Sequence, residues 1–293
     1  MVCQKARKER TMYQNILLCT DGSPAADVAG DYAIWFAKKL NAHLRALYVT
    51  DVRLLEGPWI VDFSGAIGAQ PYTALLPQLQ QIQREKAETV LAAVESRCQD
   101  GGVACETSYK TGSLAPAIAE QESGADIIVL GQRGEHAAWL AGALGSSVER
   151  VVRASVKPCL VTPDKFRPIR HMLIAYDGSA ESSKALRAGI ALAPALGAQV
   201  TITMVAALGA EDAAFEALHK AKQQATEAGV TANAEPLHGD AEIQILELKE
   251  SIGADLVVMG AYGHTRIREL ILGSTTSHVL RKSDVPVLLV RGK

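Results

Sequence analysis

One pattern occurs twice in the 293 residues and constrains the fold more than any other feature of the sequence. Asn15–Thr20 and His171–Tyr176 are short apolar runs, and each is followed at once by Asp-Gly-Ser. Later in each half, the runs ADIIVLGQRG (Ala125–Gly134) and ADLVVMGAYG (Ala254–Gly263) end in Gly-x-x-Gly. Apolar runs of this length that stop at turns are typical of strands buried on both faces. The chain is therefore predicted to be a tandem duplication.

Strands and helices are predicted to alternate in both halves. In each Asp-Gly-Ser turn the serine is a suitable helix N-cap, which predicts helices over Ala25–Leu40 and Ala180–Ala193, the second closed by Pro194 and Gly197. Such alternation requires parallel sheets covered by helices on both faces. The predicted fold class is α/β, with two tandem, doubly wound, parallel sheets of about five strands each.

The two predicted domains span residues 13–163 and 170–292. They are joined near Thr162–Arg170, where Pro163 and Pro168 interrupt any regular element. Ligands of open parallel sheets bind beyond the carboxyl ends of the strands, where the strand order reverses. The Asp-Gly-Ser and Gly-x-x-Gly turns both follow strand ends, so each half is predicted to carry its site at that edge.

The halves differ most between Asp51 and Gln83, where the first half carries an insertion that contains prolines and aromatic residues. Long loops are usually functional or disordered, and the aromatic residues argue against disorder. A flap over the first site and an interface loop are equally good interpretations. The next helix, about Pro77–Arg97, is expected to bury an apolar stripe in the core, formed by Leu79, Ile82, Val90, Leu91 and Val94.

Composition limits the functional class. The 30 Lys+Arg and 32 Asp+Glu leave a net charge of −2, which does not indicate nucleic-acid binding, and the basic run Lys5–Arg10 is expected to be a solvated tail. No apolar stretch approaches the roughly 18 residues that span a bilayer, and no signal peptide is evident, so the protein is expected to be cytoplasmic, with no membrane contact. No metal site is predicted, and no CxxC pair occurs among the five cysteines: Cys3, Cys19, Cys98, Cys105 and Cys159.

The clearest ligand signal lies in the second half, after the apolar run that ends at Met259. Gly260 and Gly263 are followed, after nine intervening residues, by Gly273, and then at once by the hydroxyls of Ser274–Thr276. Glycines let a polyanion approach the backbone, and a helix start offers amide groups to phosphate. The alternative is an ordinary turn, with Ser274 serving only as an N-cap. The recurrence of the pattern in both halves favours the ligand loop.

These motifs resemble tandem universal stress protein domains over nearly the whole chain. The glycine spacing of the second half matches the ATP-binding pattern of that family, Gly-x2-Gly-x9-Gly-Ser/Thr. The resemblance implies nucleotide contacts in the second half from Asp177, the main chain at Val205, Gly260, Gly263, His264, Gly273, Ser274 and Thr275. In the first half the implied positions are Asp21, Val49, Gly131, Gly134, Gly145, Ser146 and Ser147.

The second site is ranked above the first. The spacer from Glu135 to Leu144 has ten residues, one more than the family pattern. Glu135 also places a negative charge next to the expected phosphates, where the second half has His264. The first loop therefore departs from the pattern in both length and charge.

Three functions follow from these observations. The first is a regulatory protein, not an enzyme, that binds ATP with or without Mg²⁺ and hydrolyses it slowly at most. The second is a nucleotide-free stress scaffold that acts through protein contacts, with partners that the sequence does not identify. The third, an ATPase or nucleotidyl-transfer enzyme, has the least support, because no Walker A, HRD or DFG motif is present.

The resemblance also implies how the halves pack. They are expected to pair about a pseudo-twofold axis, as an intramolecular pseudo-dimer, through the last strands at Lys157–Val161 and Pro286–Val290. A homodimer of the whole chain is an open alternative.

Overall fold

The computed structural model describes residues 13–51, 70–134, 146–261 and 272–291. The elements of the first half are β1 (Asn15–Thr20), α1 (Pro24–Leu40), β2 (His43–Thr50), α3 (Gln70–Asp100), β3 (Cys105–Thr111), α4 (Leu114–Glu122), β4 (Ile127–Gly131), α5 (Ser146–Ala154) and β5 (Cys159–Thr162). Those of the second are β6 (His171–Ala175), α6 (Ala180–Leu196), β7 (Gln199–Ala206), α7 (Glu211–Glu227), β8 (Ala232–His238), α8 (Ala241–Ser251), β9 (Leu256–Gly260), α9 (Ser274–Lys282) and β10 (Val287–Val290).

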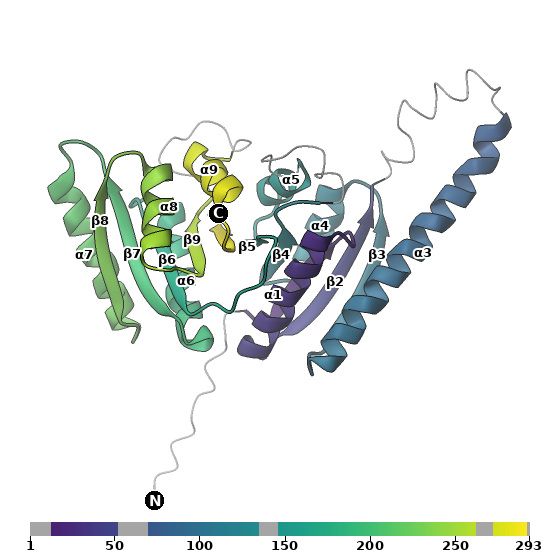
Figure 1. Cartoon of the computed structure of the whole chain (residues 1–293), viewed down its shortest axis with the longest axis horizontal. Coiled ribbons are helices and arrows are strands. Elements are labelled where there is room, and N and C mark those ends of the chain that lie inside the picture. Colours follow the sequence, from purple (N-terminus) through teal and green to yellow (C-terminus); the bar gives the residue numbers. More distant parts are fainter. Residues whose placement is uncertain (1–12, 52–69, 135–145, 262–271, 292–293) are drawn as a thin grey trace, which may run out of the picture.

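The strands form one ten-stranded sheet in the order β3-β2-β1-β4-β5-β10-β9-β6-β7-β8. Neighbouring strands within each half are parallel, whereas β5 and β10 are antiparallel, with Leu160 opposite Leu288. The predicted α/β class is confirmed, and so is the pairing through the last strands. The two five-stranded sheets are joined into a single sheet that runs through the middle of the molecule (Figure 1).

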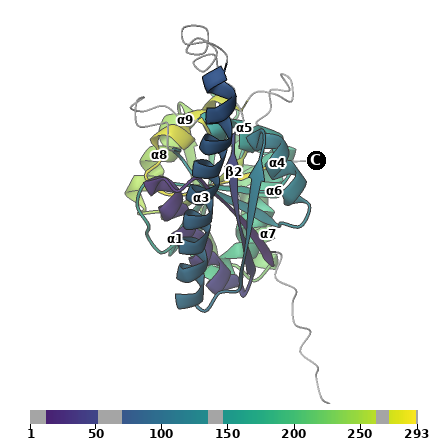
Figure 2. The ribbon, with the colours of Figure 1, turned by 90° about the vertical axis from the view of Figure 1, so that its right-hand side faces the viewer.

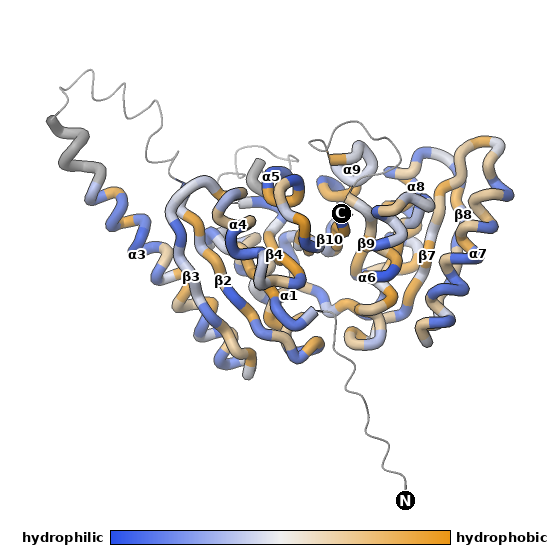
Figure 3. Tube along the Cα trace, turned by 180° about the vertical axis from the view of Figure 1, so that it is seen from behind, coloured by the Kyte–Doolittle hydropathy of each residue, from blue (hydrophilic) through white to orange (hydrophobic). Residues whose placement is uncertain are grey.

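Helices cover both faces of this sheet. Alternate residues of β1 separate into two cores, since Ile16 and Leu18 face the side of α1, α3, α6 and α7, while Leu17 faces the side of α4, α5, α8 and α9. All three side chains are at most 1% exposed, as expected for a strand buried on both faces. Apolar residues follow one another along β4 and β9, whereas hydrophilic residues are frequent along α3 (Figure 3).

The predicted N-caps are confirmed, and one helix end is corrected. The Ser23 and Ser179 hydroxyl oxygens accept hydrogen bonds from the amides three residues later, at 3.2 and 3.1 Å. However, α6 does not end at Ala193, as predicted, but continues through Pro194 to Leu196. Pro194 lacks the N–H that would bond to the carbonyl of Ile190, but only two helical residues follow it, so little of the helix depends on that bond. The end is set by Gly197, whose left-handed conformation (φ 66°) lets its N–H bond to the carbonyl of Ala193.

The helix after the insertion is also longer than predicted. It begins at Gln70 instead of Pro77, so residues 70–83 belong to a helix, whereas 52–69 lie outside the described residues. Among the described side chains of α3, core contacts begin at Ala87, and Ile82 is 57% exposed, so the prediction that the whole stripe is buried was wrong. The physical reason is that α3 runs past the body of the protein (Figures 1 and 2), where no other described element lies beside its first turns.

The two Asp-Gly-Ser glycines provide a matched test of this packing. Gly22 and Gly178 have φ of 77° and 80°, but a Cβ at Gly22 would lie 2.6 Å from Val90 Cγ2 of α3, whereas one at Gly178 would meet nothing within 4 Å. We expect Gly178→Ala to lower the free energy of unfolding by roughly 1–2 kcal/mol through backbone strain alone. Gly22→Ala should cost roughly 1–3 kcal/mol more through overpacking. Urea unfolding of both variants measures the difference, and adding Val90→Ala should remove it.

Candidate functional site

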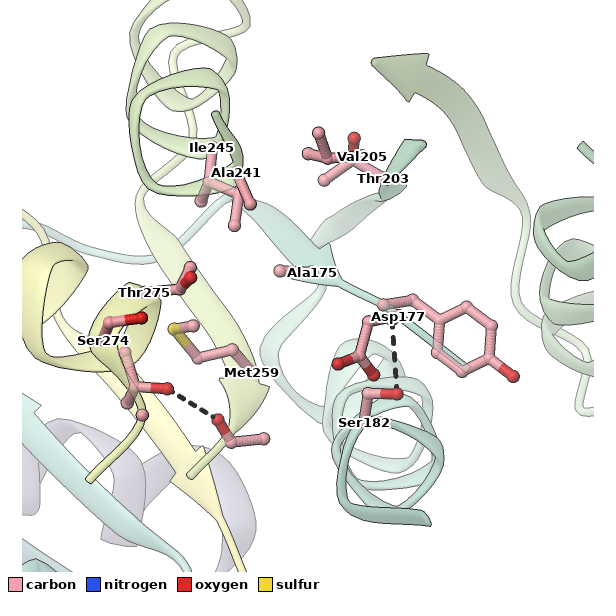
Figure 4. Close-up of a pocket in the computed structure, with 14 residues that line it drawn as sticks. Ala175, Asp177, Ser182, Thr203, Val205, Ala241, Ile245, Met259, Ser274 and Thr275 are labelled. Carbon is pink, nitrogen blue, oxygen red and sulfur yellow. Dashed lines mark hydrogen bonds between the residues drawn. The ribbon is translucent and has the colours of Figure 1, made fainter. Parts of the chain in front are cut away.

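A pocket of about 250 Å³ opens at the carboxyl ends of β6, β7 and β9, on the edge of the sheet predicted to bind ligands. Its walls come from these strand ends and from the first turns of α6, α8 and α9 (Figure 4). The lining residues are Ala175, Tyr176, Asp177, Ser182, Thr203, Val205, Ala241, Ile245, Met259, Gly260, Gly273, Ser274, Thr275 and Thr276. Six of the predicted site residues, Asp177, Val205, Gly260, Gly273, Ser274 and Thr275, are thus brought together.

Asp177 follows β6 and has a structural role as well as a place in the pocket wall. Its Oδ1 accepts a hydrogen bond from the Ser179 amide at 2.9 Å, and its own N–H donates to the Ser182 hydroxyl at 3.3 Å. The first-half turn repeats the first of these bonds, from the Ser23 amide to Asp21 Oδ1 at 3.0 Å. One carboxylate oxygen therefore fixes the turn, while the residue also borders the pocket (Figure 4).

The start of α9 forms the opposite wall. Gly273, not Ser274, is the N-cap, and no side chain caps this helix, so the N-cap alternative for Ser274 was wrong. The Thr276 hydroxyl is buried and donates to the carbonyl of Gly260 at 3.2 Å, which ties the helix to the end of β9. Ser274 is exposed and Thr275 is half-buried, so both hydroxyls border the pocket together with the first amides of α9.

The main chain of Val205 faces the pocket because of where β6 ends. The carbonyl of Thr203 accepts the N–H of Tyr176 at 2.8 Å, and the β6–β7 register ends with Ala175 opposite Thr203. Alternate residues of a parallel strand direct both main-chain groups to the same neighbour. The N–H and C=O of Val205, two residues further on, therefore point past the end of β6, where they offer a donor beside an acceptor.

Gly260 is required by close packing. A Cβ at this position would lie 3.0 Å from Glu181 Cβ and 3.1 Å from the amide of Ser182, in the first turn of α6. Gly131 lies in the same way against α1, where a Cβ would be 2.8 Å from the carbonyl oxygen of Ala25. These two glycines let the strand ends approach the helices that follow the Asp-Gly-Ser turns.

The corresponding region of the first half is lined differently. Equivalent positions in the two halves hold Cys19 and Ala175, Leu47 and Thr203, Leu114 and Ala241, and Leu130 and Met259. The first three of these exchanges give the first half the larger side chain, and Leu114 packs against the adjacent core. Space that is open between β6, β7 and α8 is thus occupied by side chains in the first half.

Residues 131–134, which begin the first glycine loop, have contacts both within the predicted first site and outside it. Within it, Gly134 lies against Asp21, since a Cβ there would be 2.9 Å from Asp21 Oδ2. The Gln132 side chain donates to the carbonyl of Leu280 in α9 of the other half. Arg133 pairs with Asp164 at 3.0 Å. This loop therefore contacts α9 and the segment that joins the halves.

Several predicted residues remain untested by geometry. Gly145, Gly263 and His264 lie outside the described residues, and Ser146 and Ser147 begin α5 without described side chains. Val49 is half-buried at the end of β2, in the place of Val205. The sequence motifs did not indicate several other pocket residues, of which the largest are Tyr176, Met259 and Ile245.

Among the described residues, no three metal-binding side chains come close enough together to hold a metal ion. No helix found in the same residues has the length and apolar character needed to cross a membrane.

The fold and the pocket together define the class, a tandem α/β protein with a pocket at the strand ends of its second half. The model of the Universal stress protein family matches residues 12–163 and 168–291. The chain therefore belongs to the universal stress protein family, as its motifs predicted.

Full-length relatives share the tandem arrangement. The chain is 40% identical over 288 residues to a universal stress protein of Synechocystis sp., covering 95% of this chain and 100% of the relative. It is 27% identical over 311 residues to one of Mycobacterium tuberculosis, covering 94% of each. The crystal structure of a universal stress protein from Archaeoglobus fulgidus superposes with a TM-score of 0.76 at 25% identity, covering 94% of this chain and 98% of that one.

Proposed function

We propose that the protein is a stress-response regulator that binds an adenine nucleotide, ATP, in the pocket of its second half. The observation that carries this proposal is the pocket itself, in which a main-chain donor and acceptor at Val205 stand opposite the uncapped start of α9. Its volume of about 250 Å³ lies just below the roughly 300–1,000 Å³ typical of small-molecule sites.

The base would bind at the strand ends. Adenine carries an amino donor beside a ring-nitrogen acceptor, which matches the C=O and N–H of Val205. The side chains of Ala241 and Ile245, from the first turns of α8, supply apolar contact at this end of the pocket. We therefore assign this end to the base.

The phosphates would bind at the other end. The first amides of α9 carry the positive end of the helix dipole, which stabilises an anion. Ser274 and Thr275 add hydroxyl donors, and Gly273 leaves the approach open. Gly260, Gly263 and His264 complete the proposed loop on the basis of the sequence pattern, and the carboxylate of Asp177 would face the ribose or a phosphate-bound Mg²⁺.

The nucleotide is proposed to act as a ligand that shifts conformation or partner choice, not as a substrate. We also propose that the first site, at Asp21, Val49, Gly131, Gly134, Gly145, Ser146 and Ser147, binds more weakly or not at all. Support comes from the bulkier residue Leu114 and from the longer spacer. The proposed domains remain 13–163 and 170–292, and the homodimer remains an open proposal.

The test is the stoichiometry of released ligand. We expect mass spectrometry of the denatured, purified protein, or titration with Mg-ATP where none co-purifies, to find about one adenine nucleotide per chain. Saturation at 100 times Kd should raise the free energy of unfolding by about 2.7 kcal/mol. Two nucleotides per chain would contradict the weaker first site. No binding at all would favour the nucleotide-free scaffold.

A further inference from the structure

Two cysteines meet where α3 ends and β3 begins. Cys98, in the last turn of α3, is 0% exposed, while Cys105 is half-buried at the start of β3 and packs against the same core. The chain reverses between them through Gly102 (φ 66°), and the amide of Val103 donates to the carbonyl of Cys98 at 2.9 Å. This reversal brings the end of α3 and the start of β3 together, so that both sulfurs lie against the same core and each thiol influences the other.

The same reversal in the second half uses no sulfur. There the amide of Val230 donates to the carbonyl of Ala225 at 2.8 Å, so Ala225 occupies the place of Cys98 and Ala232 that of Cys105. Both alanines are buried, at 0% and 3% exposed. A methyl group at each of the two positions is thus sufficient for packing in this fold. The paired thiols of the first half add redox reactivity, which packing does not require.

We propose that Cys98 and Cys105 form an oxidisable dithiol site, which a peroxide converts into a reversible disulfide between α3 and β3. One thiolate attacks the O–O bond of hydrogen peroxide, which gives a sulfenic acid and hydroxide, released as water with the thiol proton. The second sulfur then displaces the sulfenic oxygen, which leaves as water. The sum is two thiols and one peroxide giving one disulfide and two waters, and it is the same whichever sulfur reacts first.

The two remaining described cysteines provide a contrast within the same chain. Burial raises the pKa of the Cys19 thiol and raises the pKa of Cys159 to about 12, so both stay protonated near neutral pH. The pKa of Cys98 is lowered instead, chiefly because the Cys105 thiol donates to its sulfur, with Arg97 nearby. The thiolate is the reactive form, so oxidation should favour the pair.

The disulfide would fasten a part of α3 that already holds the first half together. Arg97, next to Cys98, bonds to Asp31 of α1 at 2.6 Å, and β3 is the edge strand of the sheet. Two turns earlier in the helix, α3 places Val90 over Gly22 of the first Asp-Gly-Ser turn. Cross-linking α3 to β3 should therefore stabilise the first half without touching the pocket of the second.

A single tryptic peptide tests the proposal. Residues 98–110 contain both cysteines and no lysine or arginine before Lys110, whereas Cys3, Cys19 and Cys159 lie in other peptides. After mild hydrogen peroxide treatment of the folded full-length protein, we expect this peptide to lose the mass of two hydrogen atoms and to escape alkylation. Dithiothreitol should restore it. The peptides with Cys19 and Cys159 should remain alkylatable.

The control variant is Cys98→Ala with Cys105→Ala, which copies the alanine pair of the second half and should therefore fold. Peroxide should raise the thermal midpoint of the wild-type protein and leave that of this variant unchanged. A peptide 98–110 that stays fully alkylatable, that links to Cys3, or that carries a sulfinic acid on one sulfur would overturn the proposal. So would an equal midpoint shift in the variant.

Discussion

Replacing Ala241 with leucine is expected to weaken binding of the adenine nucleotide about 5- to 150-fold, the equivalent of roughly 1–3 kcal/mol of overpacking. Ala241 is the first residue of α8, and its methyl group lines the pocket beside Ile245 (Figure 4). A leucine would fill the space assigned to the base. The fold should tolerate this change, because Leu114 already occupies the equivalent position of α4. Titration calorimetry with Mg-ATP measures the loss.

Two controls separate pocket filling from general damage. Ile243→Leu changes the same helix at a position that is 45% exposed, and it should leave Kd unchanged. Leu114→Ala performs the reverse exchange in the first half, and it should leave the affinity of the second site unchanged. An unaltered Kd for Ala241→Leu would place the base elsewhere and remove the main support for the proposed orientation.

The fold could be predicted to this extent because its signals are local and repeated. The Asp-Gly-Ser turns fix strand ends and N-caps within a few residues, and Ser23 and Ser179 both cap as expected. The length of α3 could not be predicted, because the periodicity of Leu79 and Ile82 does not reveal whether another element is there to cover them. The end of α6 was misjudged because proline was taken as a stop, although the helix continues for two residues beyond Pro194.

The residues of the candidate site also differ in whether a local sequence pattern could predict them. Gly260, Gly273 and Ser274 could be selected because glycine spacing and a helix start carry a recognisable pattern. Ala241 could not be selected in this way, because an alanine at the start of a helix belongs to no motif. Its importance is evident only when it is compared with Leu114, the residue at the equivalent position of the first half. Contacts of the first-half glycine motif, such as that from Gln132 to Leu280, join residues far apart in sequence, and no local pattern predicts them.

The largest loss of stability is expected from substitutions at the antiparallel contact between β5 and β10, which joins the two halves. Leu160 and Leu288 stand opposite each other across β5 and β10, and both are 0% exposed. Truncating either to alanine should lower the free energy of unfolding by about 2–5 kcal/mol. Because the residues are cross-strand neighbours, the double variant should depart from additivity by about 0.5–3 kcal/mol. Leu44→Ala, in distant β2, should combine additively with Leu288→Ala.

Fluorescence decides whether the joined sheet unfolds as one unit. All three tryptophans, Trp35, Trp59 and Trp139, belong to the first half, whereas Leu288 belongs to the second. If β5 and β10 couple the halves, Leu288→Ala should lower the denaturant midpoint seen by tryptophan fluorescence as much as the midpoint seen by far-ultraviolet circular dichroism. An unshifted fluorescence transition would mean that the first half unfolds independently. The antiparallel pair would then be a contact between two separately stable sheets, and nucleotide bound in the second half could not act on the first through it.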